Sequence, residues 1–132
     1  MDKVAMEVAI EEFERLAAAA DVDIDTSNMD DIDKESVEEI RDIVVQAIQA
    51  GRLTVDAQGR AVLVTSDGAS ITFRTPVGAD LMILGNSRED KRMESMARFV
   101  CAITGESSRV IDKLGKRDWK LALRLAGFLA AD

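Results

Sequence analysis

Residues 52–74 constrain the fold more than any other part of the chain, because they predict strands between two blocks of helical sequence. Two β-branched runs flank the turn sequence Asp56-Ala-Gln-Gly59, in which Gly59 can take the positive φ that a short hairpin requires. A third run, Ser70–Arg74, follows the turn Ser66-Asp67-Gly68. Short runs joined by tight turns predict a three-stranded antiparallel β-meander.

The sequence before this sheet predicts a helix, an acidic linker and a second helix. Apolar residues at three- and four-residue steps indicate an amphipathic helix over Lys3–Ala20. They are Met6, Ile10, Phe13, Ala17 and Ala20. Residues 21–35 are dense in Asp and predict a linker, whose apolar residues could fold onto a partner or back onto the chain's own domain. These apolar residues are Val22, Ile24, Met29 and Ile32.

The second helix is expected over about residues 36–50. Ser36 and Glu39 form a Ser-x-x-Glu pattern that is typical of a capping box. Gly51 stands just past the helix end, where a left-handed residue is favoured. One face of this helix is apolar and consists of Val37, Ile40, Val44, Ala47 and Ile48.

The sequence after the sheet predicts a series of helices. Thr75 and Pro76 are typical of an N-cap followed by the first helical position, which predicts a short helix over 77–84 ending at Gly85. A second helix is expected over 88–104, with Gly105 as its stop. Its apolar stripe comprises Met93, Met96, Val100 and Ile103.

Two further helices complete the expected layout. Ser107 or Ser108 begins a brief helix that Gly115 closes, and Asp118 caps the last helix. The last helix is apolar over much of its circumference, so it is either buried or a partner surface. The sequence thus predicts an α+β fold, predominantly helical, with a small three-stranded antiparallel β-meander between an N-terminal helical pair and a C-terminal helical bundle. Residues 1–35 would form an N-terminal helix and acidic linker, and residues 36–132 an α+β domain.

Composition excludes several classes of site. The chain has no His and one Cys, Cys101, so His-based catalytic arrangements, the usual zinc ligand sets and an internal disulfide framework are excluded. A lone Cys fits a reducing compartment, and the cytoplasm is the expected location. The first residues alternate acids with apolar residues, and no uninterrupted apolar stretch is long enough for a membrane span, so no membrane partner is expected.

Other candidate sites have simpler explanations. The run Asp21-x-Asp23-x-Asp25 is similar to the opening of a calcium loop, but Thr26, Asn28 and Ile32 stand where such a loop needs Gly, an apolar residue and Glu. The paired glutamates lie on polar helix faces, which favours solvated charge over acid–base catalysis. Cys101 lies in an apolar run and is expected to be a packing residue. No catalytic residue, metal or cofactor is predicted.

Charge is distributed unevenly along the chain, whose formal net charge is −8. Residues 1–50 carry −11 and residues 51–132 carry +3. This asymmetry is compatible with simple solvation of each face and with electrostatic docking between an acidic and a basic half. Residues 88–124 carry +4. Few aromatic residues accompany these bases, which favours an acidic protein surface over nucleic acid as their partner.

An ordered pattern over residues 51–129 resembles the tail assembly chaperones of tailed bacteriophages. The pattern begins with Gly51-Arg-Leu-Thr-Val-Asp56 before a hairpin, followed by a strand that leads into a helix start, Ile71-Thr-Phe-Arg-Thr-Pro76-Val-Gly78-Ala-Asp80-Leu81. It continues with the helix stop Ile103-Thr104-Gly105 and a short helix to Leu114. It closes with Asp118 before an apolar last helix that ends at Phe128-Leu129. Residues 1–50 lie outside the resemblance.

The resemblance implies a non-enzymatic protein that acts during tail morphogenesis in the cytoplasm of an infected bacterium. Such a protein self-associates, binds the tape-measure protein and tail-tube subunits, and is absent from the finished virion. We expect its binding groove on the last two long helices, although the same residues could form the domain's own core. The groove would be lined by Met93, Met96, Val100, Trp119, Leu125 and Phe128.

Two other functions fit the same sequence. One is a small acidic inhibitor of phage origin, in which carboxylates of residues 1–50 occupy the place of phosphates on a host nucleic-acid-binding protein. The other is a structural tail component that stays in the particle.

Overall fold

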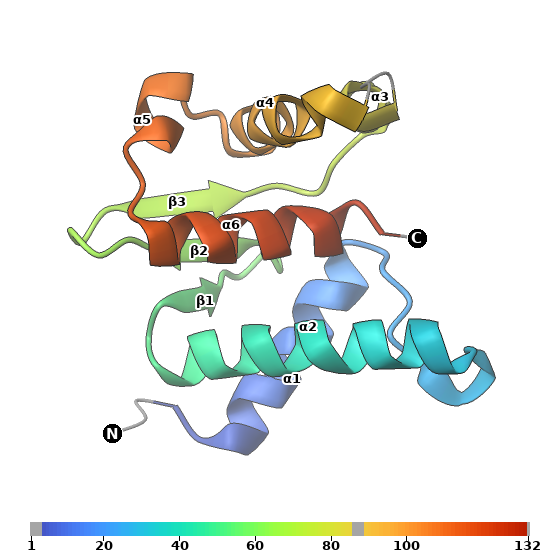
Figure 1. The fold of residues 1–132 in the computed structure, drawn as a ribbon. Helices are drawn as coiled ribbons and strands as arrows, with labels where there is room; N and C mark the ends of the chain where they lie inside the picture. Colours follow the sequence, from blue (N-terminus) through green and yellow to red (C-terminus); the bar gives the residue numbers. More distant parts are fainter. Residues whose placement is uncertain (1–3, 86–88, 132) are drawn as a thin grey trace.

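A three-stranded antiparallel sheet lies at the centre of the fold, as the sequence predicts (Figure 1). The computed structural model describes residues 4–85 and 89–131. The strands are β1 (Leu53–Val55), β2 (Ala61–Val64) and β3 (Ser70–Phe73), in the order β1-β2-β3. This arrangement confirms the predicted β-meander and the predominantly helical α+β class.

The register of the strands produces one buried face. Leu53 pairs with Leu63, and Leu63 pairs with Ile71, so the three side chains form a row across the sheet. On the same strands, Ala61, two residues before Leu63, pairs with Phe73, two residues after Ile71. All five are buried, because successive side chains of a strand alternate between its two faces and these five share one of them.

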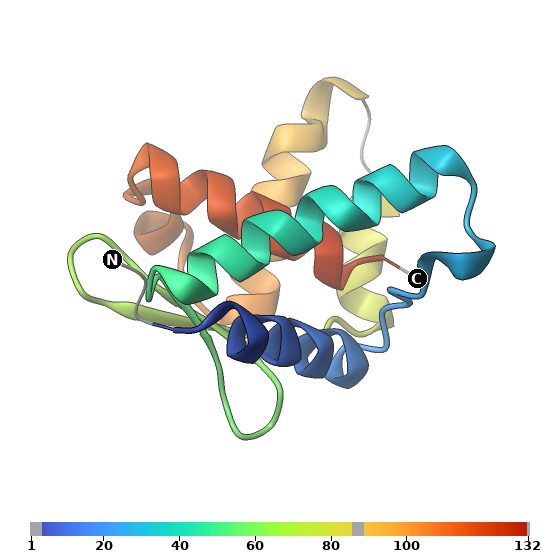
Figure 2. The same ribbon diagram turned by 90° about the horizontal axis from the view of Figure 1, so that it is seen from below.

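In the view of Figure 1, helices lie beyond both edge strands of this sheet, and one helix runs in front of it. They are α1 (Met6–Ala19), α2 (Asp31–Gln49), α3 (Gly78–Gly85), α4 (Arg92–Thr104), α5 (Ser108–Asp112) and α6 (Lys116–Leu129), with 3-10 turns η1 (Thr26–Asn28) and η2 (Glu89–Lys91). Helices α1 and α2 pack against each other and against β1, whereas α4 packs against β3. Helix α6 contacts both α2 and α4, and in Figure 2 α2 crosses it.

The hydrophobic core joins the two ends of the chain. Phe13 of α1 and Phe128 of α6 are both buried, and their ring centroids lie 5.3 Å apart. Leu16 of α1 is also buried in this cluster. Because a buried aromatic side chain contributes a large apolar area, α1 is an integral part of the core. Within the described residues, no helix is long and apolar enough to cross a membrane.

The predicted buried face of α1 is confirmed at Phe13, Ala17 and Ala20 and is wrong at Met6 and Ile10. Ala9, Phe13 and Leu16 point into the core, whereas Met6 and Ile10 are 53% and 36% exposed. The three- and four-residue spacing was compatible with more than one helical phase. Contact with β1 and α2 selects the phase that buries Leu16.

Helix α2 begins five residues before the predicted start. Asp30 is its N-cap, and one carboxylate oxygen accepts a hydrogen bond of 2.8 Å from the backbone N–H of Asp33. The prediction that Ser36 and Glu39 form a capping box is therefore wrong. The expected linker is also shorter, because Val22 is buried and Ile24 packs against the core.

The β1–β2 hairpin lies close to the end of α1. Gly59 has φ +81°, as predicted for the turn, and a Cβ atom at this position would lie only 2.5 Å from the Cβ of Ala19. Arg15 of α1 donates hydrogen bonds to the carbonyl oxygens of Val55 and Asp56. Glycine is thus required both for the turn and for the approach of the hairpin to α1.

Several predicted helix ends are confirmed and others are wrong. Gly51 and Gly105 have positive φ just past α2 and α4, and Ser107 caps α5. Thr75 and Pro76, by contrast, precede α3 and lie outside any helix, so they do not form its first turn. Gly115 does not close α5 in a left-handed conformation; it has φ −64° and is the N-cap of α6.

Candidate functional site

The structure separates the six residues that the sequence predicts for a binding groove. Val100 and Leu125 are fully buried in the core, and Phe128 is 6% exposed. Met96 and Trp119 are half-buried and pack against the core. Met93 is 61% exposed. The six residues therefore do not line one open groove, because α4 turns Phe99 and Val100 inward and Met93 outward.

Two of the six residues do meet in a smaller groove. Met93 and Trp119 line a cavity of about 340 Å³ where α4, α5 and α6 come together. Its other lining residues are Glu94, Ala97, Ile111, Asp112 and Leu114. We call these seven residues the α4–α6 groove. Two acidic side chains border its apolar lining.

The neighbouring helix α3 carries a second apolar surface that the groove prediction missed. Val77, Leu81 and Met82 are 58%, 41% and 63% exposed, and we call them the exposed α3 face. Helix α3 packs on α4 at one end of the molecule (Figure 1). The sequence signal for this surface was the run of four consecutive apolar residues 81–84, which point in different directions around a helix and therefore cannot all be buried on one face.

An ion pair between the half-exposed Arg74 and the buried Asp80 fixes the position of α3. Asp80 is 5% exposed, and its carboxylate accepts hydrogen bonds of 2.6 and 2.9 Å from the two terminal nitrogens of Arg74. It also accepts a bond of 2.8 Å from the backbone N–H of Val77. The Arg74 hydrogen bonds hold the pKa of Asp80 below its usual range. Asp80 therefore replaces the predicted Thr75 as the group that caps α3.

Arg74 connects this cap to two other elements. It follows β3 directly, and its guanidinium donates to the carbonyl oxygen of Ala102 at 3.0 Å. Its backbone N–H donates to the carbonyl oxygen of Ile103 at 2.9 Å. The pair with Asp80 raises the pKa of Arg74. The exposed α3 face thus rests on a support that is fixed by β3 and α4.

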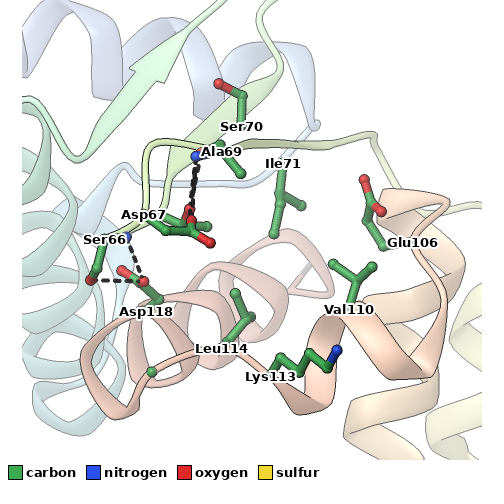
Figure 3. Close-up of a pocket in the computed structure, with 12 residues that line it drawn as sticks. Ser66, Asp67, Ala69, Ser70, Ile71, Glu106, Val110, Lys113, Leu114 and Asp118 are labelled. Atoms are coloured by element: carbon green, nitrogen blue, oxygen red, sulfur yellow. Dashed lines mark hydrogen bonds between the residues drawn. The ribbon is translucent and has the colours of Figure 1, made fainter.

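A more polar pocket of about 530 Å³ lies between the β2–β3 turn and helices α5 and α6 (Figure 3). Asp118 stands at one side of it, 2% exposed, and one carboxylate oxygen accepts bonds from the backbone N–H and the hydroxyl of Ser66, at 2.9 and 3.0 Å. Across the turn, the hydroxyl of Thr65 donates to Asp67 and accepts from the N–H of Ala69. Hydrogen bonding from Thr65 lowers the pKa of Asp67.

Asp118 therefore has a different role from the predicted one. It lies in the first turn of α6, after the N-cap Gly115, and it holds the β2–β3 turn against this helix. Its second oxygen has no hydrogen bond and lies 4.0 Å from Nε of Arg117. Arg117 in turn donates to the hydroxyl of Ser66 at 3.1 Å. These contacts make Asp118 a structural link between elements far apart in sequence.

The remaining predicted sites have local roles. Asp25 accepts hydrogen bonds from the N–H and hydroxyl of Ser27, which lower its pKa, and thereby caps η1. Among residues 4–85 and 89–131, no group of three or more His, Cys, Asp or Glu side chains is arranged to hold a metal ion. Cys101 is half-buried, and burial, followed by the charge of Asp112, raises the pKa of its thiol.

Part of the predicted basic surface forms a small groove of about 280 Å³. Arg52, Arg117, Lys120 and Arg124 line it together with Ile43 and Leu121. The spacing of the three basic residues on α6 places them on one face of that helix. Arg124 is already paired with Glu39 at 3.2 Å, so Arg52, Arg117 and Lys120 are the cations that an acidic partner would meet on this surface.

Comparison with known proteins adds no relative to this picture. No protein-family model, no curated protein and no solved structure matches the chain significantly.

Proposed function

We propose that this protein is a non-enzymatic tail assembly chaperone of a tailed bacteriophage. It binds the tape-measure protein and tail-tube subunits in the cytoplasm of the infected bacterium, and it is absent from the mature virion. The contact surface is the exposed α3 face together with the α4–α6 groove. The partners are inferred from the resemblance over residues 51–129, and the exposed apolar surface supports a role in binding another protein.

One observation carries this proposal: large apolar side chains are exposed on α3 and α4, two helices that pack against each other. Met82 and Met93 are each more than 60% exposed. The Asp80 cap nevertheless fixes α3. Exposed apolar side chains on a fixed support favour a protein-binding role. Methionine suits such a surface because its flexible side chain adapts to different partners.

The charge of the chain supports the same function. A net charge of −8 opposes nonspecific association while an apolar surface is exposed. Self-association is part of the proposal, and the groove lined by Arg52, Arg117, Lys120 and Arg124 is a suitable contact for the acidic helices of a second copy.

Co-expression with the tape-measure protein of the same phage tests the proposal. The unmodified chain should keep the tape-measure protein soluble and co-elute with it on size exclusion. The double substitution Met82→Lys and Met93→Lys should abolish co-elution, because each lost methionine contact is worth on the order of 1–2 kcal/mol. Both side chains are exposed, so the variant should fold normally.

Met6→Lys with Val8→Lys provides the matched control. These residues are 53% and 46% exposed on α1, away from the proposed surface, and the substitutions add the same charge. Retained co-elution of this control with loss for the Met82/Met93 variant supports the proposal. Separate elution of the unmodified chain, or equal effects of the two double variants, would contradict it.

An acidic inhibitor is the second candidate, and one observation favours it. Asp31, Asp33 and Glu35 are exposed in the first two turns of α2, next to the exposed N-cap Asp30. The combined substitution Asp31→Asn, Asp33→Asn and Glu35→Gln should abolish inhibition of a host nucleic-acid-binding protein and leave binding to the tape-measure protein unchanged. Deletion of residues 1–33 is unsuitable for this test, because it removes Phe13 and Leu16 from the core.

A structural tail component is distinguished by its presence in the particle. Mass spectrometry of purified virions should find the tube protein and lack this chain if the chaperone proposal is correct. Detection in stoichiometric amounts would favour the structural component.

A further inference from the structure

A separate groove of about 530 Å³ lies between the start of α2 and the end of α6, and we call it the α2–α6 groove. Its apolar lining includes Val37 and Ile40 on α2, Leu123 and Phe128 on α6, and Met29 at the end of η1. Apart from Phe128, these side chains are partly exposed. The groove is at the opposite end of α6 from Trp119, so it is distinct from the α4–α6 groove.

The shape of this groove suits a helix. Residues 33, 36, 37 and 40 of α2 and residues 123, 124, 127 and 128 of α6 line it. Each set follows the three- and four-residue spacing of one helix face, so two helical ridges border the groove. Gly127 lies in the α6 ridge, and a Cβ atom there would have no neighbour within 4 Å. A third helix can therefore approach closely at this point.

The charge around the groove identifies the kind of helix. Asp23 and Asp33 line it, and Arg124 is its basic residue. The charge of Arg124 is already matched by Glu39, whose carboxylate lies 3.2 Å from the guanidinium. Asp23 accepts a hydrogen bond of 2.9 Å from the backbone N–H of Asp25, but in the described part of the chain neither Asp23 nor Asp33 forms an ion pair with a cation. An apolar groove bordered by such carboxylates is complementary to an apolar stripe flanked by Lys and Arg.

We propose that the α2–α6 groove binds an amphipathic helix of a partner protein whose apolar stripe is flanked by basic residues. The apolar stripe occupies the space between Ile40 and Leu123, and the basic residues meet Asp23 and Asp33. This site does not depend on the function proposed above, because it uses other residues and a partner defined by its own chemistry.

Fluorescence anisotropy with two synthetic peptides tests the proposal. Both are labelled helical peptides about 18 residues long, or five turns, with the same leucine stripe. One carries Lys beside the stripe and the other carries Glu. The Lys peptide should bind the full chain at least about tenfold more tightly than the Glu peptide, and the difference should shrink as salt is added. Equal binding of the two peptides, or no binding of the Lys peptide, would overturn the proposal.

Gly127→Gln tests the position of the site. The Cβ atom of the new side chain has no neighbour within 4 Å, and glutamine has a higher helix propensity than glycine, so the fold should be retained. We expect binding of the Lys peptide to weaken about tenfold or more, because the side chain occupies the peptide's place. Gly127→Ala is the control for helix propensity and should bind nearly as the unmodified chain does. Equal binding by the Gln and Ala variants would place the peptide elsewhere.

Charge substitutions test the acidic residues. Asp23→Asn with Asp33→Asn should weaken binding of the Lys peptide and reduce its salt dependence. Glu11→Gln with Glu14→Gln removes the same charge from exposed positions on α1 and should have a smaller effect. Equal effects of the two pairs would show that only net charge attracts the peptide, which contradicts a site at this groove.

Discussion

Substitution of Gly59 by Ala probes the contact between the β1–β2 hairpin and α1. At Gly59 an added methyl group meets two obstacles. The backbone has φ +81°, which is unfavourable for residues other than glycine. The new Cβ would also lie 2.5 Å from the Cβ of Ala19, well inside normal contact distance. The hairpin or the end of α1 must move to accommodate it.

Gly68 in the β2–β3 turn separates the cost of the left-handed backbone conformation from the cost of the steric contact. It has φ +89°, and a Cβ atom there would have no neighbour within 4 Å. Gly68→Ala should therefore cost only the left-handed strain, about 1–2 kcal/mol. Gly59→Ala should cost the same strain plus overpacking of about 1–3 kcal/mol, for a total of about 2–5 kcal/mol.

Urea denaturation of the two variants measures these costs as free energies of unfolding. Ala19→Gly, which removes the opposing methyl group, should recover part of the loss in the Gly59→Ala background and none in the Gly68→Ala background. If the two glycine variants are equally unstable, and Ala19→Gly does not distinguish them, the hairpin does not lie against α1 as described.

Two further predictions concern the buried carboxylates. Asp80→Asn should lower the free energy of unfolding at pH 7 by about 2 kcal/mol, because the charged bonds from Arg74 are lost. The folded-state pKa of Asp80 lies below its usual value of 3.8, so the ion pair stabilises the native state above this pH and stops doing so as the pH falls through the folded-state pKa. The difference in free energy of unfolding between the unmodified chain and the variant should therefore persist down to about pH 4 and diminish below it. A difference that is independent of pH from about 7 to 2 would refute the stabilising ion pair between Asp80 and Arg74. Asp118→Ala should cost about 1–2 kcal/mol and speed hydrogen exchange of the Ser66 amide, and an unchanged exchange rate would show that this carboxylate does not hold the turn.

Features set by local chemistry could be predicted from the sequence. The turn at Gly59 and the helix stop at Gly105 both need positive φ, which glycine adopts without strain. Ser107 caps α5 through a hydrogen bond within one turn. The β-meander was also predicted, because β-branched runs joined by tight turns are a local signal of hairpins.

Features set by packing could not be predicted in the same way. The spacing of apolar residues in α4 did not determine which face of the helix is buried. Contact with β3 and α6 turns Phe99 inward and Met93 outward. The acidic composition of residues 30–35 indicated a linker, but acids are favoured in the first turn of a helix, where the N-terminal dipole is positive.

The candidate site was predicted only in part for the same reason. Met93 and Trp119 meet in the α4–α6 groove, whereas Val100 and Leu125 are needed in the core. The roles of Asp80 and Asp118 depend on Arg74 and Ser66, and Ser66 is 52 residues away from its partner in the sequence. Such pairing follows from the tertiary fold and leaves no periodic signal in the sequence.

Hydrogen exchange of the chain with and without its tape-measure protein tests the central claim most directly. The proposed function predicts that binding slows exchange in residues 77–85, which include α3, and in residues 92–97 of α4, since these carry the exposed α3 face and Met93. Exchange in α1 should be unchanged. Unaltered exchange in α3 and α4 in the presence of saturating tape-measure protein would contradict the account.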